Sequence, residues 1–378
     1  MHPEVLIIGG GVIGLSIARE LHKQGLRRIT LVEKGVCGEE ASSAAAGMLS
    51  PQVEADEPSA FFDLCCASRD LYPVFADELL NETGINVELD RTGTLYLAFN
   101  DEDVTEIRKR VEWQTKIGLS VEIFAENEIR HIEPVVSKNA HAASFFPNDG
   151  QVENRKLISA LKCYADINGI EIRENIQVEK LIVLDGPVTG AESGDQVITA
   201  EITVIATGAW TSLIKLGPID MPVKVEPVRG QMIAFRPVER LFRHVLCSSS
   251  GYMVPRLDDR ILAGSTSEKV GFDKTVSEAA ALTLKEMAFE MVPDLADLQI
   301  TDQWAGLRPF AYDCLPVLGS IDGFENLFFA TAHYRNGILL APLTAKLVAD
   351  KLVSNKDSEY FTKFGADRFR LRGIGKAS

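Results

Sequence analysis

Residues 5–14, "VLIIGGGVIG", hold the strongest structural signal in this chain of 378 residues. A run of four aliphatic residues leads into three consecutive glycines, and apolar side chains then recur at helical spacing through residues 15–25. The pattern predicts a strand, a tight turn and a helix. In such a unit Gly9 allows the turn, Gly11 lets a pyrophosphate approach the helix N-terminus, and Gly14 permits close packing of helix on strand.

A second apolar run, residues 29–32, ends at Glu33, which lies 19 residues after Gly14. A carboxylate at this position accepts hydrogen bonds from ribose hydroxyls and repels a 2′-phosphate, which favours FAD or NAD over NADP. A glycine-rich turn alone is a weak signal. Together with both strands, the helix and the acid, it makes dinucleotide binding the preferred interpretation.

The residues after Glu33 favour FAD over NAD. Small residues from Ala41 to Gly47 let the backbone lie against a planar cofactor, with the hydroxyls of Ser42 and Ser43 available to phosphate oxygens. A flexible linker of small residues is the alternative. Residues 202–209 predict a further strand that ends in a glycine turn beneath the nucleotide.

Composition narrows the class of partner. The 39 basic and 54 acidic residues give a net charge of -15, which disfavours nucleic acid and anionic membranes and leaves small molecules as expected partners. The six cysteines show no CxxC spacing, so we expect neither a disulfide framework nor a metal site. The N-terminus has no basic leader and no apolar run reaches spanning length, which predicts a cytoplasmic protein.

Strand and helix segments typical of a nucleotide-binding fold occur at the start, middle and end of the chain. Segments that predict antiparallel strands lie between them. Residues 101–117 and 156–168 predict helices, and residues 223–235 and 251–265 predict antiparallel strands. We expect an α/β fold, α+β overall, in which a Rossmann-like parallel sheet with helices is joined by a second domain built on an antiparallel sheet. The predicted segments are 1–84, 148–218 and 307–378 for the FAD-binding domain and 85–147 and 219–306 for the substrate-binding domain.

Several motifs resemble the FAD-dependent D-amino-acid oxidase and glycine oxidase family, and within it most nearly the branch of bacterial glycine oxidases of thiamine biosynthesis. The likeness runs from residue 4 to about residue 350. One departure is Glu39-Glu40, since the family carries an arginine near this point. The motifs are "VLIIGGGVIG" (5–14), Glu33, "SSAAAGML" (42–49), "VIATGAW" (204–210), "YMVPR" (252–256), "WAGLRP" (304–309), "DCLPVLG" (313–319) and "HYRNGILLAP" (333–342).

The resemblance implies non-covalent FAD, held by residues of these motifs and their neighbours. The cofactor-binding set is Gly9, Gly11, Val12, Ile13, Gly14, Glu33, Lys34, Ala41, Ser42, Ser43, Ala46, Gly47, Met48, Val178, Thr207, Gly208, His333, Tyr334, Arg335, Asn336, Gly337, Ile338 and Leu339.

The resemblance also places the substrate-carboxylate arginine at Arg308, its hydroxyl partner at Tyr252 and a second substrate-contacting arginine at Arg335. A guanidinium holds a carboxylate through two parallel hydrogen bonds. An internal ion pair is the alternative for Arg308. Arg256 is interpreted as structural.

No side chain is assigned an acid–base role, His333 included, because a bound amine can lose its proton without one. No metal ligand is predicted. Some sarcosine oxidases tether FAD through a cysteine in the region of Cys314, but a buried, inert cysteine is the preferred interpretation here.

The activity implied is oxidative deamination of glycine, and of sarcosine and small D-amino acids. Hydride passes from the α-carbon to the flavin, water hydrolyses the imino acid to oxo acid and ammonia, and O2 reoxidises the flavin to give H2O2. The resemblance further suggests a homo-oligomer, dimer or tetramer, that hands its imine to a thiazole synthase. Alternatives are a D-amino-acid dehydrogenase with a non-oxygen acceptor and a non-catalytic flavin-holding subunit.

Overall fold

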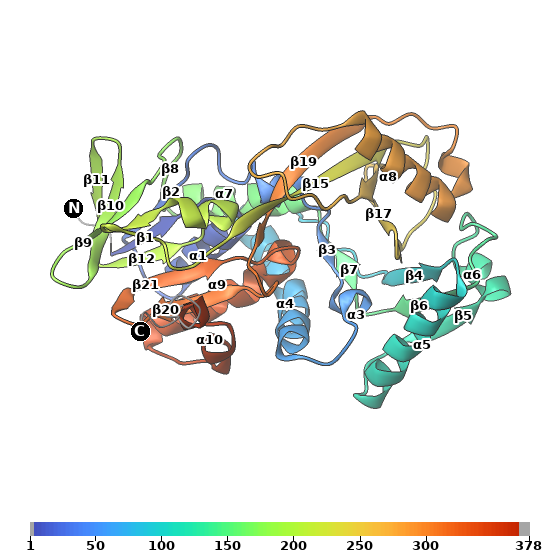
Figure 1. Cartoon of the computed structure of the whole chain (residues 1–378), viewed down its shortest axis with the longest axis horizontal. Helices are drawn as coiled ribbons and strands as arrows, with labels where there is room; N and C mark the ends of the chain where they lie inside the picture. Colours follow the sequence, from blue (N-terminus) through green and yellow to red (C-terminus); the bar gives the residue numbers. More distant parts are fainter. Residues whose placement is uncertain (1–3, 370–378) are drawn as a thin grey trace, which may run out of the picture.

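A six-stranded sheet, called the central sheet below, lies in the left half of the molecule in Figure 1. The computed structural model describes residues 4–369; residues 1–3 and 370–378, which the predicted terminal segments include, lie outside the described part. All neighbouring strands of this sheet are parallel except the pair β20 and β21. In spatial order the strands are β20 (Val317–Ile321), β21 (Phe324–Thr331), β12 (Ile202–Ile205), β1 (Val5–Ile8), β2 (Ile29–Val32) and β8 (Glu171–Arg173).

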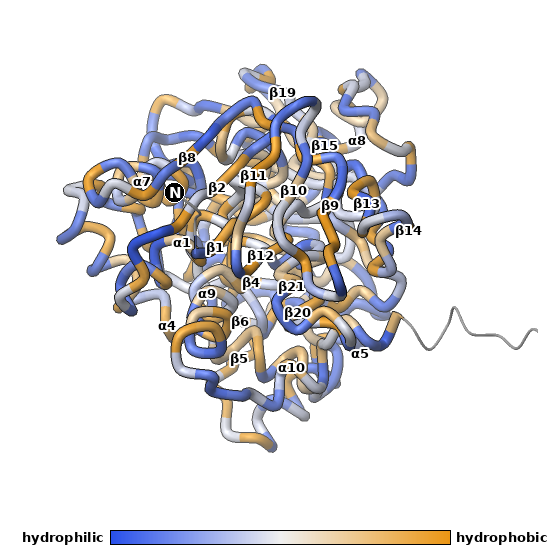
Figure 2. The backbone as a smooth tube through the Cα atoms, turned by 90° about the vertical axis from the view of Figure 1, so that its left-hand side faces the viewer, coloured by the Kyte–Doolittle hydropathy of each residue, from blue (hydrophilic) through white to orange (hydrophobic). Residues whose placement is uncertain are grey.

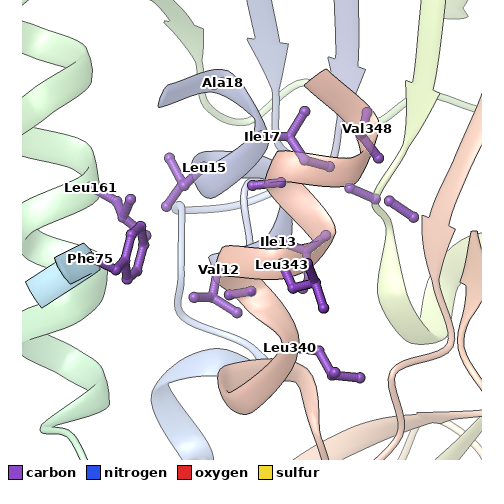
Figure 3. Close-up of a cluster of buried hydrophobic side chains, with 14 of the residues drawn as sticks. Val12, Ile13, Leu15, Ile17, Ala18, Phe75, Leu161, Leu340, Leu343 and Val348 are labelled. Atoms are coloured by element: carbon purple, nitrogen blue, oxygen red, sulfur yellow. The ribbon is translucent and has the colours of Figure 1, made fainter. Parts of the chain in front are cut away.

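Four helices pack together on one face of this sheet. Figure 3 shows the centre of their contact, where Leu15 of α1 faces Phe75 and Leu161, and Leu343 comes from α9. Because this cluster is apolar and fully buried, it fixes α1 against both the sheet and α9. The helices are α1 (Val12–Lys23), α4 (Ala60–Thr83), α7 (Asn154–Ile167) and α9 (Gly337–Ser354).

A five-stranded sheet lies over the opposite face of the central sheet (Figure 2). Buried apolar side chains of the two sheets form a second cluster between them. Its order is β11 (Gln196–Thr199), β10 (Val188–Ser193), β9 (Lys180–Val183), β13 (Lys215–Leu216) and β14 (Ile219–Asp220). The short 3-10 helices η1 (Gly208–Leu213), η2 (Pro293–Leu295) and η3 (Ala366–Phe369) and helix α10 (Glu359–Phe364) complete connections around the sheets.

An eight-stranded sheet lies at the other end of the molecule (Figure 1). Its strands are antiparallel except for the neighbours β16 and β4, and α8 (Glu278–Met291) packs on one face. Helices α5 (Asp101–Lys116) and α6 (Glu126–Ile132) lie beside its far edge. The order is β19 (Asp302–Phe310), β15 (Glu226–Phe235), β18 (Ile261–Gly264), β17 (Gly251–Pro255), β16 (Val245–Ser248), β4 (Thr94–Ala98), β6 (Ala142–Phe146) and β5 (Glu122–Ala125).

Short elements join the two halves. Strands β3 (Met48–Leu49) and β7 (Gly150–Gln151) form a two-stranded sheet, and the helices α2 (Ala41–Ala44) and α3 (Pro51–Glu54) flank β3. Strand β19 packs against both α2 and η1. The chain segment around β3 therefore lies where the central and eight-stranded sheets approach one another.

The predicted fold class, a Rossmann-like parallel sheet with helices plus an antiparallel sheet, is confirmed. The domain division remains a proposal. The predicted boundary between 306 and 307 falls inside β19, which stays paired with β15 as far as Phe310, so we place that boundary after Phe310. Among the helices of residues 4–369, none combines the length and apolar character that crossing a membrane requires.

The close packing of α1 on β1 gives a stability prediction. A Cβ on Gly14 would lie 1.9 Å from the carbonyl oxygen of Gly9, whereas a Cβ on Gly35 would meet nothing within 4 Å. Gly14→Ala should lower the melting temperature, because overpacking costs about 1–3 kcal/mol and exceeds the roughly 1 kcal/mol of helix propensity that alanine adds. Gly35→Ala is the control. Equal melting temperatures of the two variants in thermal unfolding would contradict this view of the packing.

Candidate active site

One large cavity lies between the carboxyl ends of the central strands and the strand pair β15 and β19. Ile8, Val32 and Ala206 line it from the central sheet, and Gly230 and Leu307 line it from the eight-stranded sheet. Ligands of open α/β sheets bind at the carboxyl edge of the strands, where successive loops diverge. The cavity therefore lies where this fold places a ligand.

The glycine turn forms one end of the cavity. Gly9 has φ +112°, and a Cβ there would lie 2.4 Å from the carbonyl oxygen of Ala206, so a side chain is excluded at this turn. The carboxylate of Glu33 accepts hydrogen bonds from the Gly10 N–H at 2.8 Å and the Gly35 N–H at 3.1 Å. Glu33 thus holds the turn in place while it lines the cavity.

The N-terminus of α1 opens onto the same end. No acidic residue occupies its first turn, and the Val12 N–H donates to the hydroxyl of Ser42 at 3.0 Å. The unpaired N–H groups and the helix dipole make this position attractive to an anion. Ser42 therefore lies where a phosphate oxygen would approach the helix.

The segment of small residues, 41–47, forms an ordered wall of the cavity. Side chains from distant parts of the chain hold it in place. Asn154 donates to the carbonyl oxygens of Ser42 and Ser43 at 2.7 and 3.1 Å, and Trp304 donates to that of Ala44 at 3.0 Å. The alternative of a flexible linker does not apply to residues fixed in this way. Arg256 completes the attachment by donating to the carbonyl oxygen of Ala46 at 2.8 Å.

Arg256 is buried, at 3% exposure, and its other hydrogen bonds go to Gln151, Val152 and Asn154. This is the structural position that the sequence indicated for it. Glu153 adds an ion pair at 3.4 Å.

Glu40, which stands near the position where the family carries an arginine, is neutralised by two lysines. Its carboxylate accepts hydrogen bonds from Lys34 at 2.6 Å and Lys274 at 3.0 Å. Burial opposes ionisation of Glu40, but these bonds outweigh it and lower the pKa of the carboxyl. The Lys34 ammonium also lies 4.0 Å from the ring centre of Trp210. An acid at this place therefore brings no net negative charge to the nucleotide end.

Helix α9 begins at the cavity. Gly337 and Ile338 line it, and no side chain caps the N-terminus at Asn336. His333, just before the helix, is buried and its Nε2 lies 3.1 Å from the hydroxyl of Thr344. Burial lowers the pKa of His333 to about 3, so the imidazole is neutral at physiological pH.

Arg308 reaches the end of the cavity away from the glycine turn. Its guanidinium donates to the carbonyl oxygen of Thr266 at 3.0 Å and to the hydroxyl of Ser265 at 2.6 Å. The Ser265 hydroxyl also lies 3.2 Å from the Tyr252 hydroxyl. Within the described residues, no carboxylate forms an ion pair with Arg308, so the internal ion pair considered from the sequence is not formed.

A glycine makes room for this guanidinium. Gly230 of β15 pairs with Gly306 of β19, and a Cβ on Gly230 would lie 2.2 Å from Nη2 of Arg308. The Arg308 side chain therefore lies across a bare stretch of backbone, pointing into the cavity that it lines.

Arg335 is placed differently. Its Nη2 lies 3.2 Å from Oε1 of Glu54, and both side chains line the cavity while remaining partly exposed. The charge of Glu54 raises the pKa of Arg335, and Tyr252 contributes in the same direction. Arg335 therefore shares the cavity end with Arg308 and Tyr252 but already has an acidic partner.

Most residues of the predicted cofactor set line this single cavity. Three do not: Gly14 lies behind the turn, where it permits the helix packing; the Ser43 hydroxyl donates to the Glu40 carbonyl oxygen at 3.1 Å; and Leu339 is buried in the helical core. We therefore omit Ser43 and Leu339 from the contacts that we propose. The sequence marked Glu40 only as a departure from the family, and it also lines the cavity. The lining residues that sequence reasoning missed and that bear on the chemistry are Glu54, Trp210, Gly230, Met232 and Ser265.

Cys314 does not occupy the interior position expected for it. The side chain is exposed, in a turn with φ +61°, and it is not part of the cavity lining. The prediction of a buried cysteine is therefore wrong, because the turn before β20 faces solvent. Within residues 4–369, no group of three or more His, Cys, Asp or Glu side chains could hold a metal ion.

A cavity at the carboxyl edge of a parallel sheet, with a glycine turn and an open helix N-terminus at one end, is the arrangement of a dinucleotide-binding protein. Comparison with known proteins agrees. The model of the FAD dependent oxidoreductase family matches residues 4–351. The chain belongs to this family, and FAD is its cofactor.

Individual relatives extend this result. A glycine oxidase of Geobacillus kaustophilus is 38% identical over 378 residues, covering 99% of this chain and 98% of that protein. A bifunctional protein ThiO/ThiG of Trichormus variabilis is 36% identical over 375 residues, and the chain spans 56% of its length. The crystal structure of glycine oxidase from Geobacillus kaustophilus is 34% identical with a TM-score of 0.90, covering 97% of this chain and 98% of that one.

The residues of the cavity fit FAD. Two helix N-termini, those of α1 and α9, open onto it without an acid in either first turn, and both favour negative charge. The glycine turn leaves no side chain between the backbone and a pyrophosphate. The binding roles of individual residues stay predictions, and Glu33 offers the sharpest test among them.

Glu33→Gln should weaken FAD binding, because an amide replaces one of the two carboxylate oxygens by a donor. Hydrogen bonds to a charged acceptor contribute about 1.5–3 kcal/mol, so we expect a ten- to hundredfold rise in the Kd of FAD. Titration of the apoprotein with FAD measures it. Glu33 also accepts hydrogen bonds from Gly10 and Gly35, so the melting temperature of the apoprotein is measured as the control for a loss of fold stability. An unchanged Kd of FAD would contradict a ribose contact.

Proposed function

We propose that this protein oxidises small amino acids with FAD, glycine first, then sarcosine and small D-amino acids. The observation that carries the proposal is Arg308, a guanidinium that faces the cavity without an acidic partner among the described residues. A cation held in this way by neutral groups suits a substrate carboxylate. The glycine oxidases among the relatives support glycine as the first substrate.

The neutral contacts of Arg308 prepare it for this task. Thr266 and Ser265 accept two of its hydrogen bonds, which orients the planar fork and leaves further N–H donors for the substrate. Tyr252, beside Ser265, adds a hydroxyl at the same end. The substrate carboxylate would then be fixed at one end and its α-carbon directed into the cavity.

The cavity walls at this end favour a small substrate. Met232 is buried beside the Tyr252 hydroxyl, with the sulfur 3.4 Å from that oxygen, and the Arg308 guanidinium fills the space over Gly230. A long side chain on the α-carbon would have to displace one of these side chains or extend toward the partly exposed pair of Glu54 and Arg335. Glycine and its small analogues avoid both.

FAD, when bound, supplies the redox chemistry by taking two electrons from the substrate and passing them to O2, which yields H2O2. The protein provides orientation and electrostatics. His333 is neutral and buried against Thr344, so it is not positioned to take the proton of the substrate ammonium. We propose that the amine is deprotonated before or upon binding and that water then hydrolyses the imino acid to oxo acid and ammonia.

We further propose a place in thiamine synthesis, in a cytoplasmic homo-oligomer that passes its imine to a thiazole synthase. The name of the Trichormus relative, ThiO/ThiG, supports this link, since that protein joins two activities in one chain. The present chain spans 56% of the length of that protein.

Anaerobic mixing of the yellow protein with a panel of small amino acids tests the proposal. Glycine should bleach the flavin absorbance near 450 nm, and air should restore it with one H2O2 per turnover. Bleaching without H2O2 would identify a dehydrogenase with another acceptor. A flavin that no amino acid bleaches would indicate a flavin-holding subunit.

Arg308→Lys tests the carboxylate site. Lysine keeps the charge but loses the planar two-point contact, so FAD should stay bound while kcat/KM for glycine falls roughly thirtyfold or more, from about 2–5 kcal/mol of lost pairing. Acetate, a carboxylate mimic, should raise the melting temperature of the unmodified protein more than that of the variant. Arg236→Lys, an exposed change outside the cavity, is the matched control. Equal glycine turnover and acetate protection in all three proteins would exclude this role for Arg308.

A further inference from the structure

The substrate end of the cavity carries an unusual balance of charge. Two guanidiniums, Arg308 and Arg335, line it together with one carboxylate, Glu54. The other acidic lining residues, Glu33 and Glu40, belong to the nucleotide end, where backbone N–H groups and lysines hold them. Glu54 is therefore the acid that an incoming substrate meets.

The position of Glu54 is fixed by its neighbours along the chain. Asp149, fully buried, accepts hydrogen bonds from the N–H groups of Gln52 and Val53 at the start of α3. On the other side, Asp56 pairs with Arg110 at 2.7 Å. The chain on both sides of Glu54 is thus tied to the buried side chains of Asp149 and Arg110, and the Glu54 carboxylate lies 3.2 Å from the Arg335 guanidinium.

The ion pair changes what the two arginines can bind. Arg308 has only neutral partners among the described residues, whereas Arg335 is matched by Glu54 at 3.2 Å. The three charges sum to one positive charge, which one substrate carboxylate neutralises. A substrate with a second carboxylate would leave a net negative charge in a partly enclosed site and would compete with Glu54 for Arg335.

We propose that Glu54 is a specificity-determining residue: by occupying Arg335, it restricts the site to amino acids with a single carboxylate. The inference rests on the proposed function, because it assumes that an amino-acid carboxylate binds Arg308. It predicts that removal of the Glu54 charge opens the site to dicarboxylic ligands, with Arg335 as the second anchor.

Binding of unreactive acids to the FAD-loaded protein tests the proposal without turnover. Acetate, malonate, succinate and glutarate are titrated by calorimetry into the unmodified protein and into Glu54→Gln. Since an exposed or half-exposed ion pair is worth up to about 1 kcal/mol, the variant should gain about fivefold in affinity for at least one diacid relative to acetate. The gain should shrink at high salt, because the site is partly open.

A second pair of variants shows whether Arg335 provides the anchor. The double variant Glu54→Gln/Arg335→Gln should lose the relative gain for diacids, since the freed guanidinium is absent. Glu57→Gln removes an exposed acid from the same loop outside the cavity and should leave the ratio of diacid to acetate affinity as in the unmodified protein. Glu54→Ala repeats the test with a different side chain.

Turnover provides the second measurement. The ratio of kcat/KM for D-aspartate or iminodiacetate to that for glycine should rise in Glu54→Gln. The proposal for Glu54 alone would be overturned by one result. Glu54→Gln and Glu54→Ala would still bind acetate, but the ratio of diacid to acetate affinity and the ratio of kcat/KM for diacid substrates to that for glycine would both stay unchanged. If the unmodified protein binds acetate but oxidises no amino acid, the proposed function fails while the binding titration still decides the role of Glu54.

Discussion

The close contact between α1 and β1 at Gly14 is the constraint on which the rest of the site depends. A methyl group there would overlap the Gly9 carbonyl oxygen, so only glycine lets the helix start directly at the end of the strand. The helix N-terminus then faces the carboxyl edge of the central sheet, and the turn that leads to it is bare backbone. Glu33 and Ser42 both hydrogen-bond to this turn or helix start, so their positions follow from the same packing.

Three arginines near the cavity differ in function because they differ in partners. Arg256 is buried, pairs with Glu153 and donates to carbonyl and amide oxygens, so it fixes the wall. Arg335 is matched by Glu54, and Arg308 is oriented by a hydroxyl and a carbonyl oxygen. A cation without an acidic partner at a cavity is costly unless a ligand supplies the charge. The partners of each arginine therefore decide whether it stabilises the structure or is available to bind a ligand.

The sequence predicted best what is encoded locally. The turn, the helix and Glu33 lie within one strand–helix–strand unit, so spacing along the chain reports spacing in the fold. Ser265 and Glu54 were missed because no local pattern marks them: Ser265 meets Arg308 from a position 43 residues away, and Glu54 meets Arg335 from 281 residues away. Cys314 shows the converse, since the general tendency of free cysteines to be buried suggested an interior position and the turn exposes it.

Net charge says little about what this protein binds. The chain carries a charge of -15, yet FAD contains a pyrophosphate and the proposed substrate a carboxylate. Inside the cavity the sign of the electrostatic potential depends on groups that a count of charged residues leaves out. These are the N-termini of α1 and α9 and the N–H groups of the turn. Glu33 is held by backbone N–H groups, Glu40 is offset by Lys34 and Lys274, and Glu54 offsets Arg335. Among the cationic residues that line the cavity, Arg308 alone has no acidic partner within residues 4–369, and this imbalance supports the proposed carboxylate site at that end.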